Sequence, residues 1–297
     1  MQLRSPGDAA AIAAIADTVR GATICSLAPQ RRARTSKQPG TAIRRAESAR
    51  IHTFLATSPV HMEYKLKMTP DEVIESIAHS VAYAKSFCSD VEFSAEDATR
   101  SDLDFLCRVV ETAIKAGATT INIPDTVGYM IPEEYASRIK YLREHTDGIE
   151  NVVLSRHMHN DLGMAVANSL AGVEAGIDQI ECTINGIGER AGNASMEECA
   201  MALKTRADHF GIGCNIETTQ IYRASRMIQT ITGVAVAPTK ADRRRECVRT
   251  RSRHPSARRH GEQGDLRNHD PGVRRHPEER YRAGQAFRPP CVRRAPA

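Results

Sequence analysis

The sequence SRHMHNDLGMAVANS, residues 155–169, joins a strand-like run to a helical one and carries two histidines at the junction. Side chains at alternate positions of a strand point to the same side, so we expect His157 and His159 to project together. Two imidazoles placed in this way can chelate one divalent metal ion. Asp161 follows closely enough to orient one imidazole by a hydrogen bond. Spacing alone leaves open a pair of polar strand-end histidines that binds no metal.

The same kind of junction recurs along the chain roughly every 30 to 40 residues. Strand-like segments are expected at 22–28, 51–57, 90–97, 119–126, 151–160 and 179–186. Periodicity and end signals predict helices at 8–19, 69–88, 101–117, 132–145, 162–176 and 195–210, with Ser101 as the N-cap of the third. Alternating strands and helices predict a parallel sheet joined by right-handed crossovers.

Polar side chains gather where the predicted strands end, which is where β/α barrels and open α/β sheets build their sites. Every predicted strand contributes, and this favours a barrel, because only strands near the switch point contribute in an open sheet. Glu96 lies at this rim and is a candidate base, although a solvated acidic loop would explain it equally well. The string NGIGERAGNAS, residues 185–195, offers glycines for close approach to a ligand and Asn193 as an oxygen ligand. Its alternative is a plain strand-to-helix loop in which Ser195 caps the next helix.

Composition places the chain among globular proteins without a membrane span. It has 297 residues, of which 41% are hydrophobic and 26% charged, and no apolar run of about 18 residues. The first residues, MQLRSPGDAA, lack the apolar centre of a signal peptide, so we expect a cytoplasmic protein. The eight cysteines include no C-x-x-C pair, which indicates reduced thiols rather than a disulfide framework.

The C-terminal segment differs sharply from the rest. Residues 242–297 contain 16 Arg against 7 acidic residues, a net of +9, so the remainder of this +5 chain carries −4. The segment has no Ile or Met and only five residues from Val, Leu and Phe, too few to offset the entropy of ordering. We expect a folded body over 1–240 and a disordered Arg-rich tail over 241–297.

Five strings in order resemble 2-isopropylmalate synthase: IHTFLATSPVHMEYKLKM, VEFSAEDATRSD, TTINIPDTVGY, HMHNDLGMAVANS and ECTINGIGERAGNAS. The resemblance covers Ser5 to Lys240 and implies a TIM barrel of the pyruvate-carboxyltransferase type. It implies condensation of acetyl-CoA, the co-substrate, with 3-methyl-2-oxobutanoate to give 2-isopropylmalate and CoA, with a divalent metal (Mn or Mg, Zn as an alternative) and a homodimer. Carried over residue by residue, it implies metal ligands His157, His159 and Asn193, catalytic residues Glu96 and His52, and substrate-binding residues Thr126, Gly186, Gly188 and Gly192.

The chain departs from the family at both ends. The family's opening strand, of the type DTTLRDGEQ, supplies an Asp ligand and a catalytic Arg and has no match here. The resemblance then implies an incomplete barrel of about six of the eight βα units, and an impaired enzyme. We hypothesise that the tail, and TSKQP at 35–39, are frame-shifted translations, which comparison of the three DNA reading frames would test.

Three other interpretations remain open. Citramalate and homocitrate synthases, and lyases of the same superfamily, share the H-x-H and glycine-rich features, and a few pocket residues set the choice of 2-oxo acid. An inactive gene fragment is the second. The third, a nucleic-acid-binding arm, is disfavoured because the tail has only Tyr281 and Phe287 as aromatic residues. We therefore expect small-molecule partners and neither a membrane nor a nucleic acid.

Overall fold

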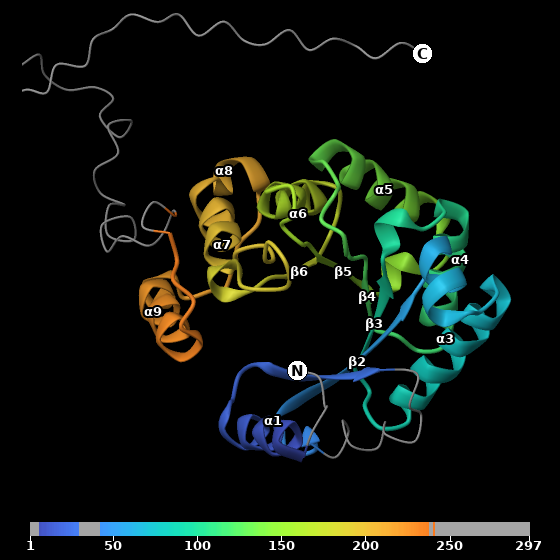
Figure 1. Cartoon of the computed structure of the whole chain (residues 1–297), viewed down its shortest axis with the longest axis horizontal. Coiled ribbons are helices and arrows are strands. Elements are labelled where there is room, and N and C mark those ends of the chain that lie inside the picture. Colours follow the sequence, from blue (N-terminus) through green and yellow to red (C-terminus); the bar gives the residue numbers. More distant parts are fainter. Residues whose placement is uncertain (1–5, 30–41, 238–239, 241–297) are drawn as a thin grey trace, which may run out of the picture. The chain divides into compact units, whose positions relative to one another are not determined.

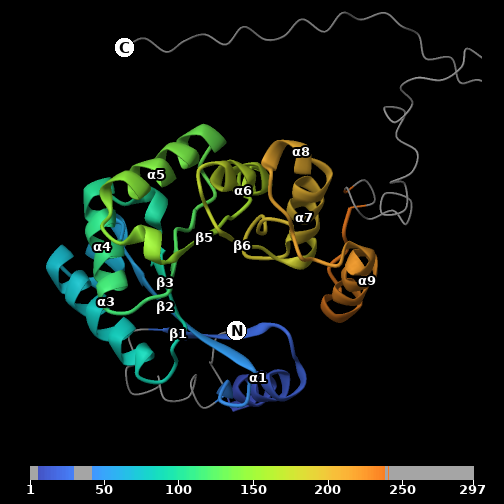
Figure 2. The ribbon, with the colours of Figure 1, turned by 180° about the vertical axis from the view of Figure 1, so that it is seen from behind.

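The protein's computed structural model describes residues 6–29, 42–237 and 240. Six parallel strands follow one another in chain order and curl into a half-barrel with helices on its outer side (Figures 1 and 2). The strands are β1 Thr23–Pro29, β2 Ser48–Ala56, β3 Val91–Glu96, β4 Thr120–Asn122, β5 Val153–His157 and β6 Gln179–Glu181. The predicted incomplete TIM-type barrel with six βα units is thereby confirmed, whereas the tail lies outside the described residues.

The helices occupy the positions expected of crossovers. The α-helices are α1 Pro6–Thr18, α3 Pro70–Lys85, α4 Leu103–Lys115, α5 Pro132–His145, α6 Ala165–Glu174, α7 Met196–Thr205, α8 Ala207–Phe210 and α9 Ile221–Thr232. Short turns are the π-helix η2 His61–Leu66 and the 3₁₀ turns η3 Ala98–Arg100, η4 Ile149–Asn151, η5 Ile184–Gly186 and η6 Thr218–Gln220. No helix of the described segments combines the length and the apolar character that crossing a bilayer requires.

Helix caps set where the crossovers begin. Thr69 and Glu72 form a capping box at the start of α3, in which each side chain accepts a hydrogen bond from the other residue's backbone N–H. The N-cap of α4 is Asp102, whose carboxylate accepts from Phe105 N at 2.9 Å. The expectation that Ser101 caps this helix is wrong. Its hydroxyl instead bonds the Asp97 carbonyl oxygen and the Thr57 hydroxyl, so it ties the β3 loop to β2.

The register aligns the strand ends that carry the polar residues. His52 of β2 lies opposite Glu92 of β3, and the pairing continues to Ala56 opposite Glu96. The outer faces pack on the helices, where Val73, Ile77 and others are fully buried. Within the described part, β1 and β6 each pair with a single neighbour, so the sheet has two edges and the barrel does not close.

Candidate active site

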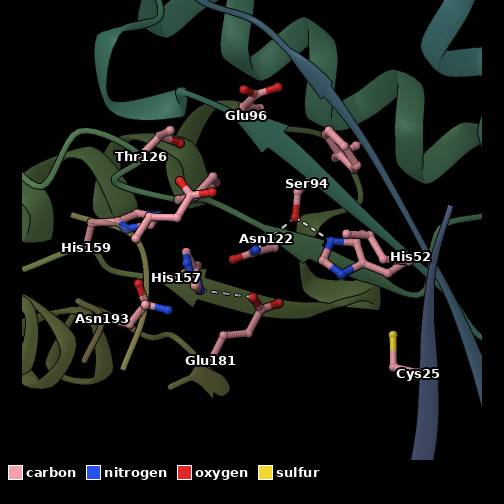
Figure 3. Close-up of a pocket in the computed structure, with 15 residues that line it drawn as sticks. Cys25, His52, Ser94, Glu96, Asn122, Thr126, His157, His159, Glu181 and Asn193 are labelled. Atoms are coloured by element: carbon pink, nitrogen blue, oxygen red, sulfur yellow. Dashed lines mark hydrogen bonds and ion pairs between the residues drawn. The ribbon is translucent and has the colours of Figure 1, made fainter. Parts of the chain in front are cut away.

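A cavity of about 480 Å³ opens inside the curl of the sheet (Figure 3). It lies at the carboxyl ends of the strands, where β/α barrels build their active sites. Its lining residues are Cys25, Leu27, His52, Phe54, Ser94, Glu96, Asn122, Pro124, Thr126, His157, His159, Glu181, Gly188, Glu189 and Asn193. Most of the residues predicted from the sequence therefore meet in one cavity. Gly186 and Gly192 are not among the lining residues.

The two histidines face the cavity from β5 and the segment after it. Their ring centroids lie 4.9 Å apart with the ring planes at 79°. Asn193 reaches the same place because its backbone forms a bridge with that of His159. Nδ1 of His159 and Oδ1 of Asn193 are buried without a hydrogen-bond partner in the described part of the chain. Buried polar atoms are normally paired, so two unpaired ones beside a second imidazole fit a metal ion.

The contact that orients His157 comes from Glu181 at the end of β6. Oε2 of Glu181 lies 3.3 Å from Nδ1 of His157. Asp161, expected to orient an imidazole, instead accepts hydrogen bonds from Arg190 at 2.8 and 2.9 Å. That expectation is wrong, because the guanidinium of Arg190 in the glycine-rich loop takes both oxygens of the Asp161 carboxylate.

The glycines of this loop mainly allow the loop to pack on itself. A Cβ atom on Gly192, whose φ is +93°, would lie 2.2 Å from the Gly186 carbonyl oxygen. One on Gly188 would lie 2.5 Å from the side-chain oxygen of Asn193. Only glycine therefore permits the close approach that brings the Asn193 amide toward the histidines.

His52 enters the cavity from β2 as a neutral ring. Its Nε2 lies 2.6 Å from the Ser94 hydroxyl, which also accepts from the Asn122 amide at 2.8 Å. Burial lowers the pKa of His52 to about 4, so the imidazole is uncharged near neutral pH. It can accept a proton or a hydrogen bond.

Glu96 and Thr126 lie at the mouth of the cavity. The Glu96 carboxylate pairs with Lys65 Nζ at 2.5 Å, and the side chain of Lys65 is half exposed. The Thr126 hydroxyl accepts from the backbone N–H of Asp97 at 2.9 Å, so its own hydrogen remains available to a ligand. Arg190 donates to the Thr126 carbonyl oxygen at 2.7 Å and fixes this segment.

A charged network below the cavity was missed by the sequence analysis. Arg50 bonds Asp90 at 2.9 Å and Gln179 at 2.9 Å, and lies 3.3 Å from Glu92. Gln179 in turn donates to Glu92 at 3.3 Å. The signal was available, because alternate positions of the predicted strands are polar on a face that usually carries branched apolar side chains.

Comparison with known proteins identifies what this arrangement is similar to. A family model described as HMGL-like matches residues 2–228. Curated proteins named 2-isopropylmalate synthase match from Dechloromonas aromatica, 56% identical over 237 residues, and from Thiobacillus denitrificans, 58% identical over 237 residues. Each match covers 80% of this chain and 46% of the relative, so the chain spans about half the length of these relatives. The resemblance drawn from the five strings is thereby confirmed.

Solved structures show the same fold at low identity. Hydroxymethylglutaryl-CoA lyase from Pseudomonas aeruginosa superposes with a TM-score of 0.63 at 19% identity, covering 82% of this chain and 78% of that one. The HMG-CoA lyase from Brucella melitensis gives a TM-score of 0.63 at 16% identity, covering 78% and 84%. At these identities the likeness concerns the fold alone.

Proposed function

The chain belongs to the HMGL-like family, and from this premise we propose that its cavity serves an acyltransferase of the 2-isopropylmalate synthase type. Such an enzyme would join the methyl carbon of acetyl-CoA to the keto carbon of 3-methyl-2-oxobutanoate. Water would then cleave the thioester, giving 2-isopropylmalate and CoA. A cytoplasmic location and a role in leucine biosynthesis belong to the same proposal.

One observation supports this proposal above all others. His157, His159 and Asn193 share a single cavity with His52, Glu96 and Thr126, although they come from separate segments. The proposed metal ligands are the two histidines and Asn193, whose buried unpaired atoms suit a cation. When bound there, Mn²⁺ or Mg²⁺ would act as a Lewis acid toward the keto oxygen of the 2-oxo acid.

The side chains of the cavity can be given roles in the addition. The Glu96 carboxylate can take a proton from the acetyl methyl group once it leaves Lys65, which is half exposed and free to turn toward solvent. The Thr126 hydroxyl can donate to a substrate carboxylate. The neutral His52 ring can hydrogen-bond the acyl group from the opposite wall.

The choice of 2-oxo acid is the part of the proposal for which related enzymes offer an alternative. Citramalate and homocitrate synthases would use pyruvate and 2-oxoglutarate in the same cavity. The apolar lining includes Leu27, Phe54 and Pro124, which suits the branched apolar chain of 3-methyl-2-oxobutanoate better than a second carboxylate.

The test is CoA release from acetyl-CoA with each 2-oxo acid in the presence of Mn²⁺ or Mg²⁺. We expect metal-dependent release that is greatest with 3-methyl-2-oxobutanoate and falls to background in the H157A/H159A double variant. A matched control is H145A, which removes a histidine from the end of α5, away from the cavity. Release that is unchanged in the double variant, or greatest with another 2-oxo acid, would overturn the proposal.

A further inference from the structure

A second group of metal-binding side chains lies beside the cavity, on the first three strands. Donor atoms of Cys25, His52 and Glu92 all lie within 4.8 Å of one another. His52 of β2 pairs directly with Glu92 of β3. On β1, the residue that pairs with His52 is Leu27, and Cys25 lies two positions before it. Positions two apart on a strand share a face, so the pleat brings the three side chains together. None of them is among the proposed ligands His157, His159 and Asn193.

Two carboxyl groups face each other at this group. Glu92 is 3% exposed and contacts Glu181, whose side chain is about a quarter exposed. Burial raises the pKa of Glu92, and the hydrogen bond with the neighbouring Glu181 raises it further. Like charges brought this close favour a cation as well as a proton. A divalent ion held by Cys25, His52 and Glu92 would balance the charges of the Glu92 carboxylate and the Cys25 thiolate.

The surrounding hydrogen bonds leave the ligand atoms available. Ser94 holds Nε2 of His52, which fixes the ring and leaves the second ring nitrogen for a metal. Arg50 is a competing cation 3.3 Å from Glu92. It also bonds Asp90 and Gln179 at 2.9 Å each, so it keeps two partners if Glu92 turns to a metal ion.

The donor types select the metal. The thiolate sulfur decides the metal: beside one imidazole nitrogen and one carboxylate oxygen, it favours Zn²⁺ and similar ions over Mg²⁺ and Mn²⁺. Three protein ligands leave the fourth position of a tetrahedral ion open to water or a small ligand. Cys25 and His52 also line the cavity, so that position would face it.

We propose that Cys25, His52 and Glu92 form a second metal site, which takes a thiophilic divalent cation of the Zn²⁺ class. On binding, the thiol proton of Cys25 leaves to solvent, as does any proton on the Glu92 carboxyl group, and bonds form from the cation to sulfur, nitrogen and oxygen. The site is separate from the histidine pair, and its ligands come from other strands. The inference does not rest on the proposed function, because no substrate enters its test; while the cation is bound, His52 is its ligand and does not hydrogen-bond the acyl group.

The test is titration of the metal-free full chain with Co²⁺, which gives a thiolate-to-cobalt charge-transfer band only when sulfur is a ligand. We expect such a band, its loss in C25S, and its displacement by Zn²⁺, which binds more tightly than Co²⁺ to the same ligands. We expect E92Q to keep the band but to weaken Co²⁺ binding at least about 10-fold, since even residues outside the ligand shell affect metal affinity by that much.

Two controls separate this site from the rest of the chain. The H157A/H159A variant should keep the band, and C214S, which removes a half-buried thiol elsewhere, should also keep it. Circular dichroism of each variant checks that a lost band does not reflect unfolding, and C25A provides a second substitution if C25S unfolds. Absence of the band in the unmodified chain, its survival in folded C25S or C25A, or its loss in folded H157A/H159A would each overturn the proposal.

Discussion

Glu181 contacts the His157 ring at 3.3 Å from the end of β6. A carboxylate that pairs with one nitrogen of an imidazole sets its tautomer and its orientation toward a metal. We expect E181Q to weaken Mn²⁺ binding at the histidine pair by about 10- to 100-fold, the range found for such partners. Electron paramagnetic resonance of free Mn²⁺ measures this directly. D161N is the matched control, because Asp161 bonds Arg190 rather than an imidazole; equal losses in the two variants would contradict the assignment.

The glycine-rich loop positions the Asn193 amide and also packs on itself, and substitutions at Gly188 and Gly192 test these two roles separately. In G188A, the new Cβ would displace the Asn193 amide, whose side-chain oxygen is 2.5 Å away, so Mn²⁺ affinity should fall while the fold persists. In G192A, the Cβ meets the Gly186 carbonyl oxygen at 2.2 Å and φ is +93°, so the free energy of unfolding should fall by more than about 1 kcal/mol.

Urea unfolding and Mn²⁺ titration of both glycine variants check these outcomes together. G213A, at a position whose added Cβ meets no atom within 4 Å, is the control. If G188A binds Mn²⁺ as tightly as the unmodified chain, Asn193 is not a ligand.

At the scale of elements, the capping box of α3 gives a pH dependence. Hydrogen bonds from the backbone and side chain of Thr69 lower the pKa of Glu72 below its usual 4.5. A lowered carboxyl pKa means that the unfolded state binds more protons between the two pKa values. The stabilisation is therefore complete above about pH 4.5 and is lost as pH falls through the lower, folded-state value.

We expect T69A to cost about 1 kcal/mol of unfolding free energy at pH 7. The difference between the unmodified chain and E72Q should shrink as the pH is lowered below 4.5. Denaturant unfolding at several pH values measures both. E75Q, on the same helix but outside the box, should show no such convergence; a constant difference for E72Q across the pH range would rule out the box as its source.

The order and type of the elements up to β6 could be predicted, but the strand lengths could not, and neither could α9 or the division of the helix predicted at 195–210 into α7 and α8. The predicted strand 119–126 shortens to β4 Thr120–Asn122 because Pro124 has no backbone N–H to donate to β3. Hydrogen bonds to β5 nevertheless continue from Ile123 N and Asp125 N. The segment keeps its direction toward the cavity although it leaves the ladder. Sequence patterns record polarity, and they do not record which of two neighbours a residue bonds.

The candidate site also contains residues that could be predicted from the sequence and residues that could not. Residues in unusual strings, such as His157, His159 and Asn193, could be predicted from the sequence to share a site, and they line one cavity. Glu181 was not identified, because a single acidic residue in a short strand is equally expected on its solvent face, and Glu92 was given no role although alternate positions of its strand are polar. Their role depends on contacts between strands far apart in sequence, as does the pairing of Asp161 with Arg190, 29 residues later.

At the scale of the whole molecule, the half-barrel determines what the cavity lacks. Among the described residues, the lining includes Glu181 and Glu189 in addition to Glu96, but no Lys or Arg. Three cationic side chains around the cavity contact carboxylates: Arg190 contacts Asp161, Arg50 contacts Asp90, and Lys65 contacts Glu96. A 2-oxo acid is an anion, and its keto oxygen gains negative charge during addition. Apart from the proposed metal ion, the described lining therefore provides little electrostatic stabilisation of that charge.

We accordingly expect the 297-residue chain, assayed by itself, to turn over acetyl-CoA and 3-methyl-2-oxobutanoate at well below about 1 per second, the lower end of ordinary enzymes. Loss of one preorganised electrostatic group commonly costs about 10²- to 10³-fold in rate, and no cationic side chain of the described lining supplies that group. The measurement is CoA release at saturating substrates and metal, with H157A/H159A as background. A monodisperse preparation that turns over at about 10 per second would contradict the expectation that the half-barrel is impaired.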